Sequence, residues 1–326
     1  MEKLLGLPID ASTHGHEIDQ LINFVHILMF VLFIGWGAFF VYLLARFRKG
    51  KQQKADYTGV KSHASSYLEG VIVVIEILLL AAFSIPFWAK KVSAAQEPPA
   101  EAVRIRVVAQ QFAWNIHYPG KDGKLGTTRL DLYDEKTNPI GLDRTSPHGA
   151  DDITSINQLR IPVGKPILLE ITSRDVIHSF AVPLLRVKQD AIPGMSIPMK
   201  FTASKTSADI TAHYRRPLKL PTKLNAYLYK VTEDVKDKDG KVLLKKNARV
   251  PKDYSELVAA GITELSVVPA DPIEIVCGQL CGNGHYNMKG FVQILTPEAF
   301  EEWLEEEHES LKEEFPELFP DAKKDE

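Results

Sequence analysis

Two long apolar runs near the N-terminus restrict the folds open to this chain of 326 residues. The first extends from Leu21 to Phe47, and the second from about Tyr67 to Trp88. Crossing the hydrocarbon core of a bilayer takes about 20 such residues in a helix. We therefore predict a transmembrane helical hairpin over residues 21–91, preceded by an external N-terminal segment of residues 1–20.

Charge asymmetry predicts how this hairpin is oriented. The connection between the two runs holds one acid, Asp56, against six basic residues, whereas residues 1–20 contain only Lys3 as a base. The basic residues are Arg46, Arg48, Lys49, Lys51, Lys54 and Lys61. Because basic loops stay on the cytoplasmic side, the N-terminal segment and everything after Lys91 are expected outside.

Two carboxylates interrupt the second apolar run. Glu69 and Glu76 are seven residues apart and so lie on one face of a helix. An acid within a span is costly and usually faces a protein partner or a water path. We expect the hairpin to pack against a larger membrane subunit.

The rest of the chain is predicted to form a β domain over residues 103–296, after a linker at residues 92–102. Alternating apolar and polar residues indicate strands at 103–108 and 159–163, and further strands are expected at 166–172, 273–276 and 290–295. An insert at about 204–268 is expected to hold a hairpin of 226–231 with 241–245, turned at 238–240. Residues 297–326 are acidic and are expected to form a helix, 299–315, with a tail.

A glycine-rich loop near the end of the β domain holds the only two cysteines, Cys277 and Cys281. His285 follows four residues after Cys281, and Met288 three residues later. Thiolate, imidazole and thioether are soft ligands that suit copper. The cysteine spacing alone also allows a disulfide, and zinc would use the thiols but has little use for methionine. The full pattern favours copper, either one ion or a pair bridged by both sulfurs.

A pair of bridged copper ions needs a second histidine from elsewhere in the chain. His178 closely follows the strand expected at 166–172, where a side chain could reach the cysteine loop. A histidine at a strand end is, on its own, more often an ordinary surface or core residue. We take His178 as the candidate for this second histidine ligand.

These features together resemble subunit II of the haem–copper cytochrome c oxidases. The resemblance covers the hairpin and residues 103–119, 157–203 and 273–296. Its motifs are the Cys277 to Met288 pattern, Asp175–Phe180 and Val187–Gly194. It implies a cupredoxin domain, a Greek-key sandwich that holds a dinuclear copper A centre, on the periplasmic side of a bacterial plasma membrane.

The resemblance also implies a ligand set. Cys277 and Cys281 would bridge both coppers, and His178 and His285 would each bind one. Met288 and the backbone carbonyl of Gln279 would be weak axial ligands. The family often has glutamate at the position of Gln279, where its carboxylate also contacts a magnesium ion at the interface with subunit I. The neutral amide here puts that magnesium contact in doubt.

Further roles are implied for four residues. Phe112 stands where the family usually has an exposed tryptophan that receives electrons, and Trp114 lies nearby in the same aromatic segment. Both rings could equally pack over the copper loop. Glu69 matches an acid near the mouth of a proton path, and Asp175 matches an acidic position used in docking cytochrome c.

The implied function is that of the electron-receiving subunit of a respiratory oxidase. Electrons from cytochrome c or a similar donor would reach copper A and then haem in subunit I, where oxygen reduction drives proton pumping. No oxygen chemistry is expected in this chain, and no nucleic-acid partner. A copper-free quinol oxidase subunit or a membrane-tethered copper-binding protein are the alternatives.

Overall fold

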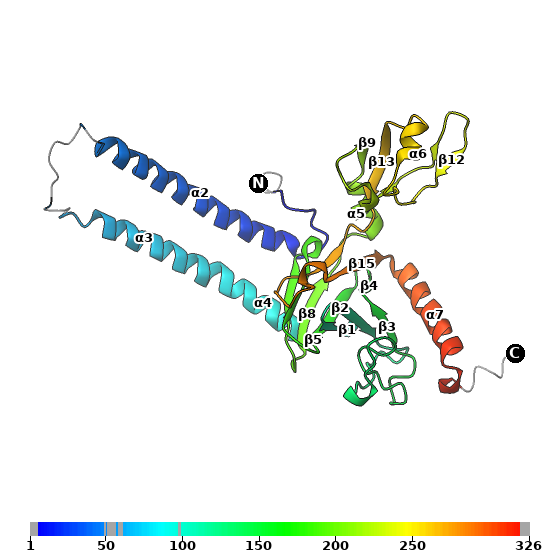
Figure 1. Cartoon of the computed structure of the whole chain (residues 1–326). Helices are drawn as coiled ribbons and strands as arrows, with labels where there is room; N and C mark the ends of the chain where they lie inside the picture. Colours follow the sequence, from blue (N-terminus) through cyan, green and yellow to red (C-terminus); the bar gives the residue numbers. More distant parts are fainter. Residues whose placement is uncertain (1–5, 49, 51–56, 58–60, 97–98, 320–326) are drawn as a thin grey trace. The chain divides into compact units, whose positions relative to one another are not determined.

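The computed structural model describes residues 6–48, 50, 57, 61–96 and 99–319 (Figure 1). Contacts divide the chain into a helical unit, built mainly on Gly15–Glu97, and a β-rich unit that comprises Pro8–His14 and Pro98–Glu326. Ala11, at the centre of the short segment, is fully buried, and its backbone bonds with Leu184 and Ser204. Part of the predicted external N-terminal segment therefore belongs to the β-rich unit.

The helical unit contains the two predicted apolar helices. Helix α2 covers Gly15–Arg46, and the second helix runs as α3 (Ala64–Leu79), a π turn η1 (Leu80–Ser84) and α4 (Ile85–Gln96). Both are long and apolar enough to cross a membrane, over Gly15–Arg46 and Ala64–Lys90. The second helix ends at Gln96, inside the predicted linker. Lys49, Lys51 and Lys54 of the basic connection lie outside the described residues.

The π turn was not predicted from the sequence, yet it has a local cause. Pro86, the second residue after it, has no backbone N–H to donate to the carbonyl four residues earlier, at Ala82. Loss of that bond lets the backbone widen by one residue, as in other π bulges.

The β-rich unit is built on two five-stranded sheets (Figure 1). One has the order β3-β2-β1-β5-β8 and the other β4-β15-β14-β6-β7. In each, one pair is parallel, β1 with β5 and β15 with β4, and the other pairs are antiparallel. The strands are β1 Val103–Gln110, β2 Ala113–Tyr118, β3 Ile153–Ile156, β4 Gln158–Pro162, β5 Pro166–Ser173, β6 His178–Val182, β7 Val187–Ala191, β8 Ile197–Thr202, β14 Glu274–Cys277 and β15 Lys289–Leu295.

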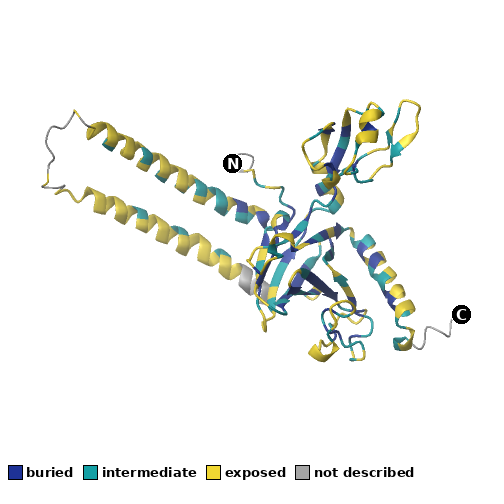
Figure 2. Ribbon diagram, in the orientation of Figure 1, coloured by how far each residue is buried: buried dark blue, intermediate teal, exposed yellow. Residues whose placement is uncertain are grey.

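The inner faces of the two sheets share one core, which is visible as the dark strands of Figure 2. Trp114 of β2 meets Phe180 of β6 edge to face, with ring centroids 5.4 Å apart. Most of the largest fully buried side chains come from the two sheets: Trp114, Tyr118, Phe180, Ile105, Ile116, Ile153, Leu159, Ile161, Ile167, Leu169 and Ile171. The predicted sandwich of two β-sheets is confirmed.

The insert expected at about 204–268, the second of two inserts in the β-rich unit, forms a small second lobe with its own apolar cluster. Its three-stranded sheet has the order β10-β13-β9, so β10 pairs with β13. The predicted pairing of 226–231 with 241–245 is therefore wrong, although Gly240 does lie in a turn, between β11 and β12. Lys241–Lys245 contains a strand that is too short and too exposed to compete with the buried β13 as partner. The elements are α5 Ser207–His213, β9 Arg216–Lys219, η4 Ala226–Leu228, β10 Tyr229–Val231, β11 Val235–Lys236, β12 Val242–Leu244, α6 Ser255–Ala259 and β13 Glu264–Pro269.

The predicted C-terminal helix is confirmed as α7, Pro297–Glu314, followed by η6 (Pro316–Leu318). Thr296 caps its first turn by accepting a hydrogen bond from the Ala299 N–H. Its apolar face packs on the sandwich, where Trp303 meets Tyr118 with ring centroids 5.0 Å apart and lies under the Arg160 guanidinium. The acidic residues occupy its other face.

A buried carboxylate, that of Asp152, ties the first insert, residues 120–156, to the sandwich. The insert holds η2 (Leu130–Leu132). Asp152 is fully buried and accepts hydrogen bonds from the backbone N–H groups of Gly120 and Gly126 and from His117 Nε2. Burial outweighs the neighbouring carboxylate and holds the pKa of His117 below its ordinary value. One side chain therefore closes both ends of a loop that has little regular structure.

Asp152→Ala should destabilise the β-rich unit because it leaves three buried donors without an acceptor. We expect a loss of about 3 kcal/mol, seen as a fall of roughly 6–12 °C in the melting midpoint of the detergent-solubilised chain. Asp151→Ala is the matched control, because the neighbouring Asp151 side chain accepts a hydrogen bond from the exposed Lys121 N–H. Equal melting of the two variants would show that the buried carboxylate does not hold the insert.

Candidate metal centre

Two neighbouring strands bring the distant histidine to the first cysteine. Cys277 ends β14 and His178 begins β6, and these strands pair antiparallel with Cys277 opposite Phe180. The His178 Nδ1 atom lies 3.9 Å from the Cys277 Sγ atom. The potential ligand atoms of His178, Cys277 and Cys281 all lie within 4.8 Å of one another. The ladder therefore joins residues that are 99 positions apart in sequence.

The other three predicted ligands converge on the same two sulfurs. His285 Nδ1 and Met288 Sδ lie 3.6 and 3.7 Å from Cys281 Sγ, and the Gln279 carbonyl oxygen lies 3.2 Å from Cys277 Sγ. His285 opens a short 3₁₀ turn, η5 (His285–Asn287), that returns the chain to β15. Each of the four other candidate donors therefore has an atom within 4 Å of one of the two cysteine sulfurs.

The two cysteines are free thiols in this structure. Their sulfurs are 3.8 Å apart, whereas a disulfide bond is about 2.05 Å long. Cys281 is buried and Cys277 half-buried. The geometry thus does not favour the disulfide alternative and leaves both sulfurs available as ligands.

An aspartate fixes which nitrogen of His178 faces the sulfurs. His178 is fully buried, and its Nε2 lies 2.8 Å from Asp175 Oδ1. A proton on Nε2 is held by that carboxylate, so Nδ1 presents its lone pair toward Cys277. Burial alone would raise the pKa of Asp175, but hydrogen bonds from the Gln111 N–H, His178 and the Val176 N–H hold it below its ordinary value. Sequence reasoning missed this contact, although the Asp175-x-x-His178 spacing offered a signal.

Phe112 and Trp114, the two aromatic candidates for receiving electrons, have different surroundings. Phe112 is 38% exposed, and its ring lies against the cysteine loop, where a Cβ added at Gly284 would meet it at 2.4 Å. Trp114 is completely buried, and its ring contacts His178 edge to face at 6.2 Å between centroids. Of these two rings, only that of Phe112 can touch a partner that approaches the surface.

Glycine is required where the loop passes beneath that ring. Gly282 has a φ of +135°, a conformation that side chains disfavour, and an added Cβ would also meet the Gln111 amide at 2.6 Å. The Gln111 side chain donates to the Cys281 carbonyl at 2.6 Å. Sequence reasoning missed Gln111, and its type and position gave no signal for this role.

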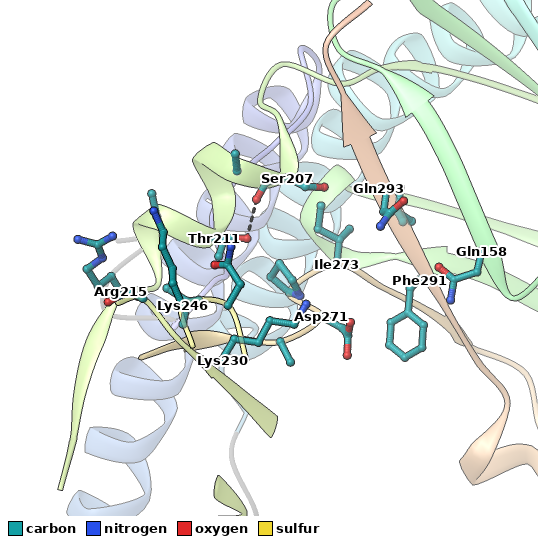
Figure 3. A pocket seen from close by; sticks show the side chains of 18 residues that line it. Gln158, Ser207, Thr211, Arg215, Lys230, Lys246, Asp271, Ile273, Phe291 and Gln293 are labelled. Carbon is teal, nitrogen blue, oxygen red and sulfur yellow. Dashed lines mark hydrogen bonds between the residues drawn. The ribbon is translucent and has the colours of Figure 1, made fainter. Parts of the chain in front are cut away.

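Glu69 and Glu76 lie on α3 of the helical unit, both exposed, and neither belongs to the group of ligands described above. A separate cavity of about 390 Å³ lies between the sandwich and the second lobe (Figure 3). Arg215, Lys230 and Lys246 line it together with Asp271. None of the six candidate ligands lines this cavity, so it is not part of the candidate metal centre.

The donor set fits a pair of copper ions. Two free thiols side by side can each bridge two ions, and each sulfur has an imidazole nitrogen within 4 Å. A buried thioether and a backbone carbonyl complete a set of soft and neutral donors. The carboxylate nearest the cluster is engaged by His178 and two backbone groups rather than by the sulfurs.

Comparisons with known proteins agree on one family. The family described as cytochrome c oxidase subunit II, periplasmic domain, matches residues 103–210. An alternative cytochrome c oxidase subunit 2 of Bradyrhizobium diazoefficiens is 25% identical over 297 residues, 91% of this chain and 82% of the relative. Cytochrome c oxidase subunit 2 of Cereibacter sphaeroides is 24% identical over 212 residues, 61% of this chain and 67% of the relative.

Solved structures include a similar chain. The periplasmic domain of subunit II of a cytochrome oxidase from Bradyrhizobium japonicum has a TM-score of 0.33 and 20% identity, over 66% of this chain and 99% of that one.

Copper affinity of the metal-free chain should rise with pH. Burial, together with the hydrogen bond and charge of Cys277, raises the pKa of the Cys281 thiol to about 11, so below that pH a metal must displace a proton. We expect an increase on the order of tenfold per pH unit for each thiol proton released, measured by competition for Cu(I) between pH 6 and 8. Cys281→Ser should show a shallower slope, and a pH-independent affinity of the unaltered chain would contradict the prediction.

Proposed function

The chain belongs to the cytochrome c oxidase subunit II family, and from that premise we propose that it receives electrons for a haem–copper oxidase. The observation that carries the proposal is the convergence of His178, Cys277 and Cys281 on one point. His285, Met288 and the Gln279 carbonyl complete the same cluster.

We propose that Cys277, Cys281, His178 and His285 would hold a pair of copper ions. Met288 and the Gln279 carbonyl would be weaker donors to the same pair. When bound, the copper pair takes up and releases single electrons. The residues of this chain hold the donors in place: β6 and β14 fix His178 against Cys277, and the packed core behind them resists rearrangement. A donor set that changes little between oxidation states keeps electron transfer fast.

Phe112 is the residue at which we propose that electrons arrive, because it is exposed and rests on the cysteine loop. Trp114 supports His178 from the core instead. The donor is cytochrome c or a similar protein on the periplasmic side of a bacterial plasma membrane. Electrons leave to haem in subunit I, where oxygen is reduced and protons are pumped.

The helical hairpin is proposed to pack against subunit I. Glu69 then lies near the start of a proton path in that subunit, and the family resemblance is the support for this role. The Gln279 side chain is a neutral amide, so it lacks the charge with which a carboxylate binds magnesium at the interface. We propose no magnesium ligand at this side chain.

Cys281→Ser should abolish the two-copper centre. The full chain, solubilised in detergent and loaded with copper, is expected to be purple and to give a seven-line electron-spin signal from one electron shared by two ions. The variant loses a bridging sulfur and with it that signal. Met288→Leu is the comparison variant: it should keep the signal and raise the reduction potential, because only an axial donor is lost. A four-line signal from the unaltered chain would refute the proposal.

Phe112→Ala should slow reduction by the donor while the copper spectrum stays unchanged, because the ring touches the loop but contributes no ligand atom. Phe112→Trp should keep the rate. Tyr286→Ala is the matched control, an aromatic side chain of the same loop that is 84% exposed. Stopped-flow reduction of the purified oxidase measures all three, and an equal loss in the two alanine variants would exclude a special role for Phe112.

A further inference from the structure

The carboxylate of Asp175 is occupied by three N–H groups. Oδ1 lies 2.8 Å from His178 Nε2 and accepts from the Val176 N–H at 2.7 Å. Oδ2 accepts from the Gln111 N–H, also at 2.7 Å. The Asp175 side chain is only 24% exposed. An acid that serves mainly to attract a docking protein would leave its oxygens free for solvent and the partner, whereas both oxygens of Asp175 are engaged within the site.

Gln111 continues the same network from the turn between β1 and β2. Its backbone is held by Asp175, and its side-chain amide donates to the carbonyl of Cys281 at 2.6 Å. The next residue is Phe112, whose ring lies within 3.3 Å of the position that a Cβ on Gly282 would take. One chain of hydrogen bonds therefore connects the imidazole of His178, the turn that carries Phe112, and the backbone of the second cysteine.

We propose that Asp175 and Gln111 act as positioning residues, which together fix the His178 ring and lock the Phe112 turn onto the cysteine loop. This inference rests on the proposed function, since it concerns how the copper ligands and the electron-receiving ring are aligned. It differs from the role expected for Asp175 from the family resemblance, an acidic contact for the electron donor, because it places the function of the carboxylate inside the site.

The physical reason is that each contact fixes one part of the site that would otherwise move. The ligand atoms must hold one arrangement to bind a metal. The carboxylate holds the Nε2 proton and leaves Nδ1 as the donor atom of His178. The Gln111 amide fixes the peptide of Cys281. Because Gln111 and Phe112 are consecutive, a shift of the cysteine loop would carry the aromatic ring with it, and the contact between ring and ligands would persist.

Asp175→Glu distinguishes positioning from docking, because it keeps the charge but moves the oxygens by one methylene. We expect copper affinity of the full chain to fall by about 10–100-fold, with a changed spin signal and a shifted reduction potential. If Asp175 serves docking alone, this variant will keep the affinity, spectrum and potential of the unaltered chain, while Asp175→Asn will weaken only the salt-dependent binding of the donor. That pattern would overturn the proposal.

Gln111→Met tests the positioning role proposed for Gln111, and this test does not depend on whether the Asp175 variants fold. It removes the amide donor at nearly constant volume, and we expect a loss in the rate of reduction by the donor together with a shifted spin signal. Gln189→Met is the matched control, since that side chain donates to the Asp190 carbonyl of β7. Equal behaviour of the two methionine variants would contradict the proposal.

A failure of the proposed function looks different from either result. In that case the unaltered chain itself gives no seven-line signal with copper, and comparison of the variants has no starting point. If the unaltered chain gives that signal and the Asp175 and Gln111 variants leave it and the potential unchanged, only the positioning role is lost.

Discussion

The pairing of β6 with β14 is the constraint on which the rest of this structure depends. It sets Cys277 opposite Phe180, so that His178, two residues earlier on β6, reaches the end of β14 where the cysteine loop begins. A shift of one residue would turn every side chain of β6 to the opposite face. Such a shift would withdraw the imidazole and expose Phe180, which the core buries completely. The apolar core therefore fixes the geometry of the candidate metal centre.

The core also reaches the site directly. Trp114 packs against both Phe180 and His178, so the same ring fills the interior and supports a candidate ligand. Met288, nearly fully buried, belongs to the core and lies 3.7 Å from the Cys281 sulfur. In contrast, the two inserts contribute no candidate ligand. The first is anchored by Asp152 and the second has a separate apolar cluster. The sulfur cluster therefore does not depend on side chains of either insert.

Much of the fold could be predicted from the sequence because its signals are local. Apolar length gave both helices, alternation gave β1 and β4, and the acidic amphipathic pattern gave α7. The predictions that went wrong depended on contacts between distant segments. In the second lobe, β10 pairs with β13 rather than with the nearby 241–245, since the buried β13 offers more apolar surface than a short exposed strand. Likewise, the packing of Ala11 in the β-rich unit leaves no trace in the local pattern.

The sequence by itself determined the chemistry of the candidate site: two thiols, an imidazole and a thioether at fixed spacing in a loop whose glycines let it fold back. Only the tertiary structure decided which aromatic residue is accessible, and that the Asp175 carboxylate holds the imidazole of His178. The physical reason is that spacing along the chain fixes which donors can share a loop. Exposure and hydrogen-bond partners, however, depend on segments such as Gln111 and Cys281, 170 residues apart, that meet only after the sheets have packed.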